Sequence, residues 1–179
     1  MSVVRIVIVE DNPADVLLLE EALKHHRVRY VLERFTNGEE AANAISAMPE
    51  APALFILDLN VPRIHGLELL RIIRACPVLA AAPVAIFTSS QAPADKARSE
   101  ELGADAYIVK PMSYHEFVTN VGASIVRLLN RPKAAGCARV SPRPPGVRRS
   151  RSVPPSRVRQ PPGWIIVVIS PQRKFCPEL

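Results

Sequence analysis

The sequence predicts an α/β fold, a doubly wound sheet of five parallel strands with helices on both faces. Short apolar runs recur along residues 1–130, and nearly all are apolar throughout, as in strands buried on both sides of a sheet. Segments with the helical spacing of apolar residues separate these runs, and the connections are short. Strict alternation of strand and helix is typical of a parallel sheet. We therefore expect one domain over residues 1–130, followed by a tail over residues 131–179.

The first strand and helix are expected over residues 3–9 and about 13–26. Asp11 or Asn12 can cap the helix, since a side-chain oxygen at this position accepts a hydrogen bond from an unpaired backbone N–H. Pro13 suits the first helical position, where a missing N–H leaves no hydrogen bond unmade.

A second strand is expected over residues 28–35, and its alternating pattern indicates more exposure than in the other strands. Asn37 and Gly38 then turn the chain into a helix over about residues 39–48. The third strand is the wholly apolar run Leu54–Leu57.

The remaining elements continue the alternation. Ser113 and Glu116, three residues apart, form the capping-box pattern at the start of the last helix. In chain order we expect a helix over 67–74, a strand over 84–87, a helix over 93–102, a strand over 106–109 and a helix to about 129.

Charge divides the chain at the same boundary as the secondary structure. Residues 1–130 carry 12 Lys and Arg against 16 Asp and Glu, a net charge of −4. Residues 131–179 carry 11 against 1, a net charge of +10, and hold 10 of the 18 prolines. Such a Pro/Arg-rich stretch buries too little apolar surface to fold, which predicts a disordered tail.

The tail offers little sign of a further activity. Its arginines can bind nucleic acid or an acidic membrane without specificity, but no aromatic residues are interleaved with them, so we favour a solvated extension. Residues 164–169 are strand-prone but far short of the ~20 that span a bilayer. Nothing after residue 130 has the periodicity of a helix-turn-helix, so specific nucleic-acid binding is not expected.

Cysteine usage and the N-terminus indicate a cytoplasmic protein. The three cysteines are widely spaced and form no metal-ligand pattern, as expected of reduced thiols. The chain enters its first strand almost at once and shows no signal-peptide pattern.

Five polar residues follow or end four of the apolar runs. Because the carboxyl ends of parallel strands meet at one edge of a sheet, these side chains are expected to converge. They are Glu10 and Asp11 after the first strand, Asp58 after the third, Thr88 after the fourth and Lys110 after the fifth. Three acids, a hydroxyl and a lysine form a site for a divalent cation and a phosphoryl group.

Four motifs at these strand ends resemble the response-regulator receiver domain, the CheY-like module of two-component signalling. They are V-E-D-N-P-A-D at 9–15, I-L-D-L-N-V-P-R-I-H-G at 56–66, F-T-S-S at 87–90 and A-D-A-Y-I-V-K-P at 104–111. The first motif also resembles stand-alone receivers associated with phytochrome-like sensor kinases. The resemblance implies the flavodoxin-like strand order 2-1-3-4-5, with Asp11 and Asp58 facing each other at the switch point.

The resemblance assigns a role to each site residue. Asp58 is the phospho-acceptor, which attacks phosphohistidine to form an acyl phosphate. Asp11, Asp58 and the main-chain carbonyl of Asn60 hold Mg²⁺, with Glu10 acting through a bound water. Lys110 and Thr88 contact the phosphoryl oxygens, and the bond from Lys110 to Pro111 is expected to be cis, as is usual in the family.

The resemblance also implies a switch and a set of partners. Movement of Thr88 toward the phosphoryl group would vacate space for the ring of Tyr107 and change a protein-binding surface. The partners implied are a sensor histidine kinase or phosphotransfer protein, a downstream protein, and a second copy of the chain paired through the switch face.

Two other functions are compatible with these residues. One is a phosphorylation-independent scaffold, although every residue that phosphorylation needs is present. The other is a Mg²⁺-dependent aspartyl-phosphate hydrolase, which usually has a second acid two residues after the nucleophile. Position 60 is Asn, which disfavours the hydrolase, so we expect a signalling module and not an enzyme.

Overall fold

The computed structural model describes residues 3–131 and 166–168. Five parallel strands form the predicted sheet in the order 2-1-3-4-5, and a sixth strand extends it beyond β2. The strands are β1 (Val4–Val9), β2 (Tyr30–Phe35), β3 (Leu54–Leu57), β4 (Val84–Thr88), β5 (Ala106–Val109) and β6 (Ile166–Val168). The wholly apolar run of β3 has the bounds that the sequence predicts.

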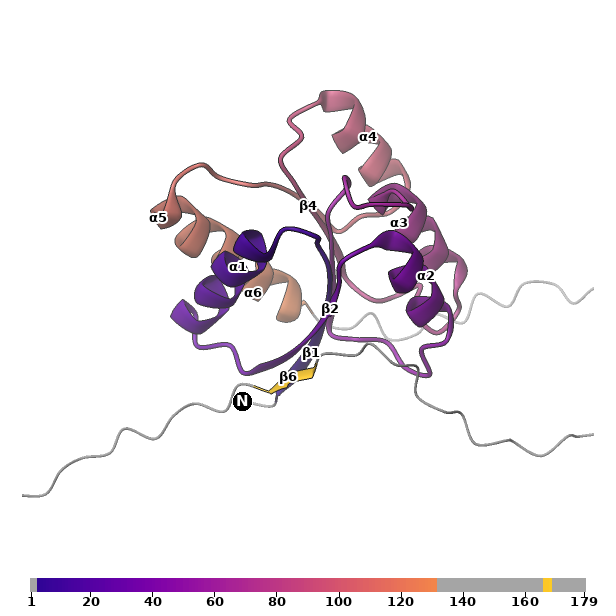
Figure 1. The fold of residues 1–179 in the computed structure, drawn as a ribbon, viewed down its shortest axis with the longest axis horizontal. Coiled ribbons are helices and arrows are strands. Elements are labelled where there is room, and N and C mark those ends of the chain that lie inside the picture. The colour runs from indigo at the N-terminus through magenta and orange to yellow at the C-terminus, as the bar shows by residue number, and fades with distance from the viewer. Residues whose placement is uncertain (1–2, 132–165, 169–179) are drawn as a thin grey trace, which may run out of the picture.

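Helices cover both faces of this sheet, as Figure 1 shows. The first and last helices lie together on one face, and the second, third and fourth lie on the other. The helices are α1 (Pro13–His25), α2 (Gly38–Ser46), α3 (Gly66–Ala75), α4 (Pro93–Glu101), and a last helix made of α5 (Tyr114–Glu116), the π-helical turn η1 (Phe117–Val121) and α6 (Gly122–Leu129). None of them combines the length and apolar character needed to cross a lipid bilayer.

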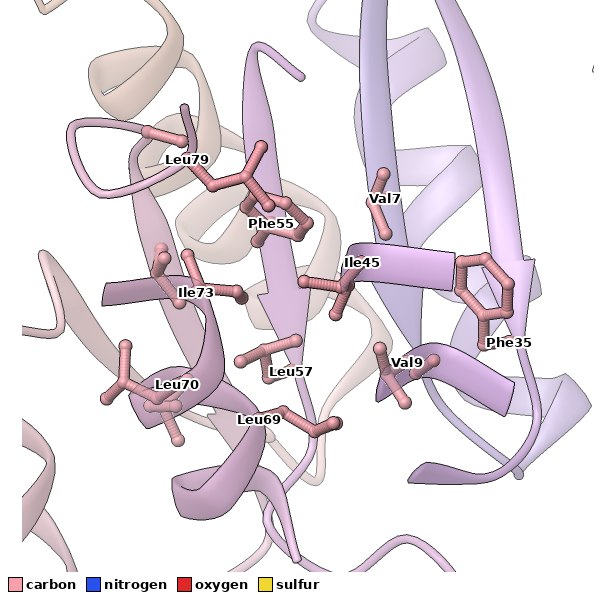
Figure 2. Packing of buried hydrophobic residues seen from close by; sticks show 14 of the residues in the cluster. Val7, Val9, Phe35, Ile45, Phe55, Leu57, Leu69, Leu70, Ile73 and Leu79 are labelled. Carbon is pink, nitrogen blue, oxygen red and sulfur yellow. The ribbon is translucent and has the colours of Figure 1, made fainter. Parts of the chain in front are cut away.

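The central strands contribute side chains to two separate cores, because successive residues of a strand point to opposite faces. In β1, Val7 and Val9 pack under α2 and α3, whereas Ile6 and Ile8 pack under α1 and the last helix. Phe55 and Leu57 of β3 join Val7 and Val9 on their face, together with leucines and isoleucines of α2 and α3 (Figure 2). Burial on both faces explains why these strands are continuous apolar runs.

The side-chain cap predicted for the first helix is confirmed at Asn12, and Asn37, predicted only as a turn residue, caps the second helix. The Asn12 side chain accepts a hydrogen bond from Ala14 N, and the Asn37 side chain accepts one from Glu40 N. Ser113 is the N-cap residue of the last helix, but its side chain makes no capping hydrogen bond. The predicted capping box of Ser113 and Glu116 is therefore wrong. Because Ser113 is exposed, the first backbone N–H groups of the helix can donate hydrogen bonds to water instead.

The sixth strand is the main difference from the predicted sheet. Ile166–Val168 pairs antiparallel with the outer edge of β2, with Val167 opposite Leu32. Strand-prone residues that meet an unpaired sheet edge readily add to it. Of the tail expected over residues 131–179, the structure describes Arg131 and this strand, and residues 132–165 and 169–179 lie outside the described residues.

Candidate functional site

The predicted strand-end residues meet at one edge of the sheet. Asp58 N donates a hydrogen bond to Val9 O (3.0 Å), which ties the end of β3 to the end of β1. Lys110 N donates to Thr88 O (2.9 Å), which does the same for β5 and β4. Glu10, Asp58 and Thr88 are buried there, with 1, 6 and 0% of their surface exposed.

The ammonium group of Lys110 lies at the centre of this edge. Its Nζ contacts three carboxylate oxygens: Glu10 Oε2 at 2.7 Å, Asp58 Oδ2 at 2.7 Å and Asp15 Oδ2 at 2.9 Å. An ammonium has three N–H donors, so these contacts use all of them. Only 9% of the Lys110 side chain is exposed, and Nζ also lies 5.1 Å from the centre of the Phe87 ring.

Burial and hydrogen bonding act in opposite directions on Lys110. Burial alone would lower its pKa, but hydrogen bonds to Asp58, Glu10 and Asp15 outweigh that effect and raise the pKa. The raised pKa keeps Lys110 in its charged form beside the three carboxylates.

The carboxylates at this edge nevertheless carry more negative charge than the single ammonium of Lys110 can balance. Glu10, Asp11 and Asp58 each present a carboxylate oxygen, and these oxygens lie within 4.8 Å of one another. Burial raises the pKa of Glu10 even though Lys110 opposes the shift, so the ammonium does not fully compensate this carboxylate. Clustered oxygen donors with unbalanced negative charge fit a hard divalent cation such as Mg²⁺.

Asn60 and Gly66 determine the path of the chain that follows Asp58. Asn60 N donates a hydrogen bond to Asp58 Oδ1 (3.1 Å), so the residue whose carbonyl was predicted as a cation ligand is held beside this carboxylate. A Cβ atom on Gly66 would lie 2.2 Å from Asp58 O. Only glycine allows the start of α3 to approach the acidic residue so closely.

Thr88 and Tyr107 both contact the residue between them in space, Ser90. Thr88 Oγ1 accepts a hydrogen bond from Ser90 N (3.2 Å), and the Tyr107 hydroxyl donates to Ser90 O (3.1 Å). Ser90 Oγ donates in turn to Asp95 Oδ2 (2.5 Å), in the first turn of α4. The two predicted switch residues are thus joined through a single backbone segment that also contacts α4.

Two residues of the site were missed by sequence reasoning. Asp15 lies in the first turn of α1, and its place beside the strand ends depends on how that helix is rotated above the sheet, which the sequence does not reveal. Arg34, near the end of β2, donates from Nε to Glu10 O (3.1 Å) and from Nη2 to Asp11 O (2.9 Å). Arg34 thereby holds the turn that carries both acids, and no sequence pattern marks it.

The Lys110–Pro111 bond departs from the family pattern. No peptide bond in the part of the chain that the structure describes is cis, so the expected cis isomer at this bond is wrong. Lys110 reaches the acids with a trans bond after it.

Comparison with known protein families identifies the receiver domain. The model of the response regulator receiver domain matches residues 6–122, which include every residue described above at the site.

Curated relatives are longer than this chain. The alkaline phosphatase synthesis transcriptional regulatory protein PhoP of Bacillus subtilis is 32% identical over 131 residues, which are 73% of this chain and 50% of PhoP. The response regulator ArlR of Staphylococcus epidermidis is 34% identical over 122 residues, which are 68% of this chain and 52% of ArlR. The chain thus spans about half the length of these two relatives.

Solved structures of similar length share the fold. The phosphorylated cyanobacterial phytochrome response regulator RcpA has a TM-score of 0.65 and 30% identity, covering 72% of this chain and 96% of RcpA. The Mn²⁺-bound response regulator Rcp1 has the same TM-score and coverage at 28% identity.

Proposed function

Because this chain belongs to the response regulator receiver family, we propose that it accepts a phosphoryl group on Asp58 from a histidine kinase or phosphotransfer protein. The observation that carries the proposal is the contact of Lys110 Nζ with Asp58 Oδ2 inside a cluster of acids at the strand ends. A nucleophilic carboxylate beside a permanent cation is what transfer of a phosphoryl dianion requires.

The transfer forms one bond and breaks one. A carboxylate oxygen of Asp58 attacks the phosphorus of phosphohistidine in line, and the P–N bond breaks with its electron pair returning to the imidazole. The product on Asp58 is an acyl phosphate. Lys110 and the Thr88 hydroxyl would donate hydrogen bonds to the phosphoryl oxygens, whose negative charge they stabilise.

We assign the cation site to Asp11, Asp58 and the Asn60 carbonyl, with Glu10 acting through a water. A bound Mg²⁺ supplies positive charge beside the transferred group. Arg34 fixes the backbone of the Glu10–Asp11 turn by its two hydrogen bonds to main-chain carbonyl oxygens.

Signalling would follow from the contacts of Ser90. If the Thr88 hydroxyl turns toward a phosphoryl oxygen, its hydrogen bond with Ser90 N is lost, and the segment that also contacts Tyr107 and Asp95 must shift. The surface of α4, β5 and the last helix would change for a downstream protein or a second copy of the chain. In this proposal the protein acts in the cytoplasm, on its own, through residues 1–130, and a phytochrome-like kinase is one candidate donor.

The test is the intact mass of the protein after incubation with acetyl phosphate, with and without Mg²⁺. We expect a Mg²⁺-dependent gain of one phosphoryl group in the wild type and none in Asp58→Asn, which is nearly isosteric. Glu21→Gln is the control, because it removes an exposed carboxylate that pairs with Lys24 in the second half of α1. No gain in a folded wild-type protein would contradict the proposal and favour a phosphorylation-independent scaffold.

A further inference from the structure

We propose that Asp15 is a positioning residue for Lys110. Its carboxylate keeps its hydrogen bond with the ammonium when a divalent cation binds at the cluster that contains Glu10 and Asp58. This inference rests on the proposed function, since it concerns how Lys110 gives up its contacts with Glu10 and Asp58 to a cation and then contacts a phosphoryl group at the same site. It assigns a role to the one carboxylate of the site that the cation cluster does not include.

The argument starts from the three contacts of Lys110. Two of its partners, Glu10 and Asp58, belong to the acidic cluster that can hold a cation. The third, Asp15, does not, although its Oδ2 lies 2.9 Å from Nζ. A cation in the cluster withdraws negative charge from Glu10 and Asp58 and repels the ammonium, so Asp15 becomes the strongest remaining acceptor.

Asp15 is itself held in place by the start of α1. Its Oδ2 accepts a second hydrogen bond from Asn12 Nδ2 (3.0 Å). Asn12 is fixed by its capping bond with Ala14 N and by the hydrogen bond from its own N to Glu10 Oε1 (3.1 Å). Since the Asp15 side chain is only 19% exposed, water competes weakly for this carboxylate.

The hydrogen bond to Asp15 keeps the Lys110 ammonium where it can donate to a phosphoryl group on Asp58. With one N–H on Asp15, the other two are released from Glu10 and Asp58 and become available for oxygens of a phosphoryl group on Asp58. Without Asp15, the only carboxylates left to Lys110 are those that the cation requires. The lysine and the cation would then compete directly, and the cation would bind more weakly.

A double-mutant cycle on cation binding tests this coupling without any phosphorylation. Mg²⁺ affinity is measured by calorimetry for the wild type, Asp15→Asn, Lys110→Met and the double variant. We expect Asp15→Asn to weaken Mg²⁺ binding by about 3- to 30-fold in the wild type and by less than about 2-fold in the Lys110→Met background, as for residues that act through a contact. Glu21→Gln is the matched control, because it removes an exposed carboxylate from the same helix.

Two results would overturn the inference. Equal weakening in both backgrounds would mean that Asp15 acts on the cation by its charge alone, and no weakening in the wild type would mean that it does not act. If Lys110→Met fails to fold, a crystal structure of the Mg²⁺-loaded wild type decides the question: Nζ should remain on Asp15 and leave Glu10, and the reverse would refute the role. A wild type that binds Mg²⁺ but is not phosphorylated would instead contradict the proposed function.

Discussion

Glu10 is almost completely buried, and its carboxylate is only partly compensated by Lys110. Burial raises the pKa of Glu10, so protons compete more strongly with a cation for this group as the pH falls. We expect Mg²⁺ to raise the melting temperature by several degrees at about pH 7.5 and by much less at about pH 5. Thermal unfolding with and without Mg²⁺ at both pH values measures the difference. Equal stabilisation at the two would show that Glu10 does not take part in the cation site.

Glu33 of β2 is a second buried carboxylate, and no functional role accounts for it. Its Oε1 has no hydrogen-bond partner among the residues that the structure describes, and burial raises the pKa of Glu33 although Arg5 opposes the shift. A raised pKa in the folded state favours the protonated form of Glu33. The contribution of this group to the free energy of unfolding is therefore fully present below its pKa in the unfolded chain and is lost as the pH rises through its pKa in the folded protein.

We therefore expect that replacing the Glu33 carboxylate with a neutral amide increases the free energy of unfolding, by an amount that depends on pH. Glu33→Gln should raise the free energy of unfolding by about 1 kcal/mol near neutral pH and change little near pH 3, where Glu33 is protonated in both states. Urea denaturation at the two pH values provides the measurement. Glu39→Gln, at an exposed residue that pairs with Arg63, is the control. A loss of stability at neutral pH would mean that the Glu33 carboxylate has a partner that stabilises it.

At the scale of elements, Gly66 determines how closely α3 approaches β3. A Cβ atom there would overlap the backbone oxygen of Asp58, whereas at Gly103 it would meet only the flexible Arg74 side chain, at 3.3 Å. The cost at Gly103 comes instead from its φ of +85°. We expect Gly66→Ala to cost about 3 kcal/mol or more and to impair Mg²⁺ binding, and Gly103→Ala to cost about 1 kcal/mol and leave binding intact.

Denaturation and Mg²⁺ titration of both variants check this pair of predictions. Similar losses of stability, with Mg²⁺ affinity unchanged in each, would show that the approach of α3 to Asp58 does not matter for the site.

The central strands were the easiest elements to predict, because burial on both faces makes β3 and most of β4 continuous apolar runs. Leu54–Leu57 and Ala106–Val109 have the predicted bounds. The second strand begins two residues later than predicted, at Tyr30, since the chain first leaves α1 through Arg27 with a φ of 56°. The π-helical turn at Phe117–Val121 has no sequence signal that we can identify.

At the scale of the whole molecule, the residues that meet at the site were easiest to predict where they end a strand or directly follow one. Glu10, Asp58, Thr88 and Lys110 meet because the parallel topology brings strand ends together. The position of Asp15 depends on the rotation of a helix above the sheet, and that of Arg34 on the direction of a long side chain. Topology fixes neither of these, so both residues emerged only from the structure.

The basic tail is expected to contribute little to the stability of the domain. Three of its residues pair with β2, and a pair of this length adds a small increment to a sheet that is already formed. Deletion of residues 132–179 should therefore change the melting temperature by less than about 3 °C, as for an unpacked terminus. Calorimetry of the two forms makes the comparison. A much larger drop would show that the tail is part of the folded unit.

The central claim is that Asp58 carries the phosphoryl group, and reduction of the phosphorylated protein tests it most directly. Borohydride converts an aspartyl acyl phosphate into homoserine, which peptide mass mapping locates within the chain. We predict homoserine at position 58 alone, and only when Mg²⁺ and acetyl phosphate are both present. Homoserine at Asp11 or Asp15, or none in a protein that has gained the mass of a phosphoryl group, would contradict the account.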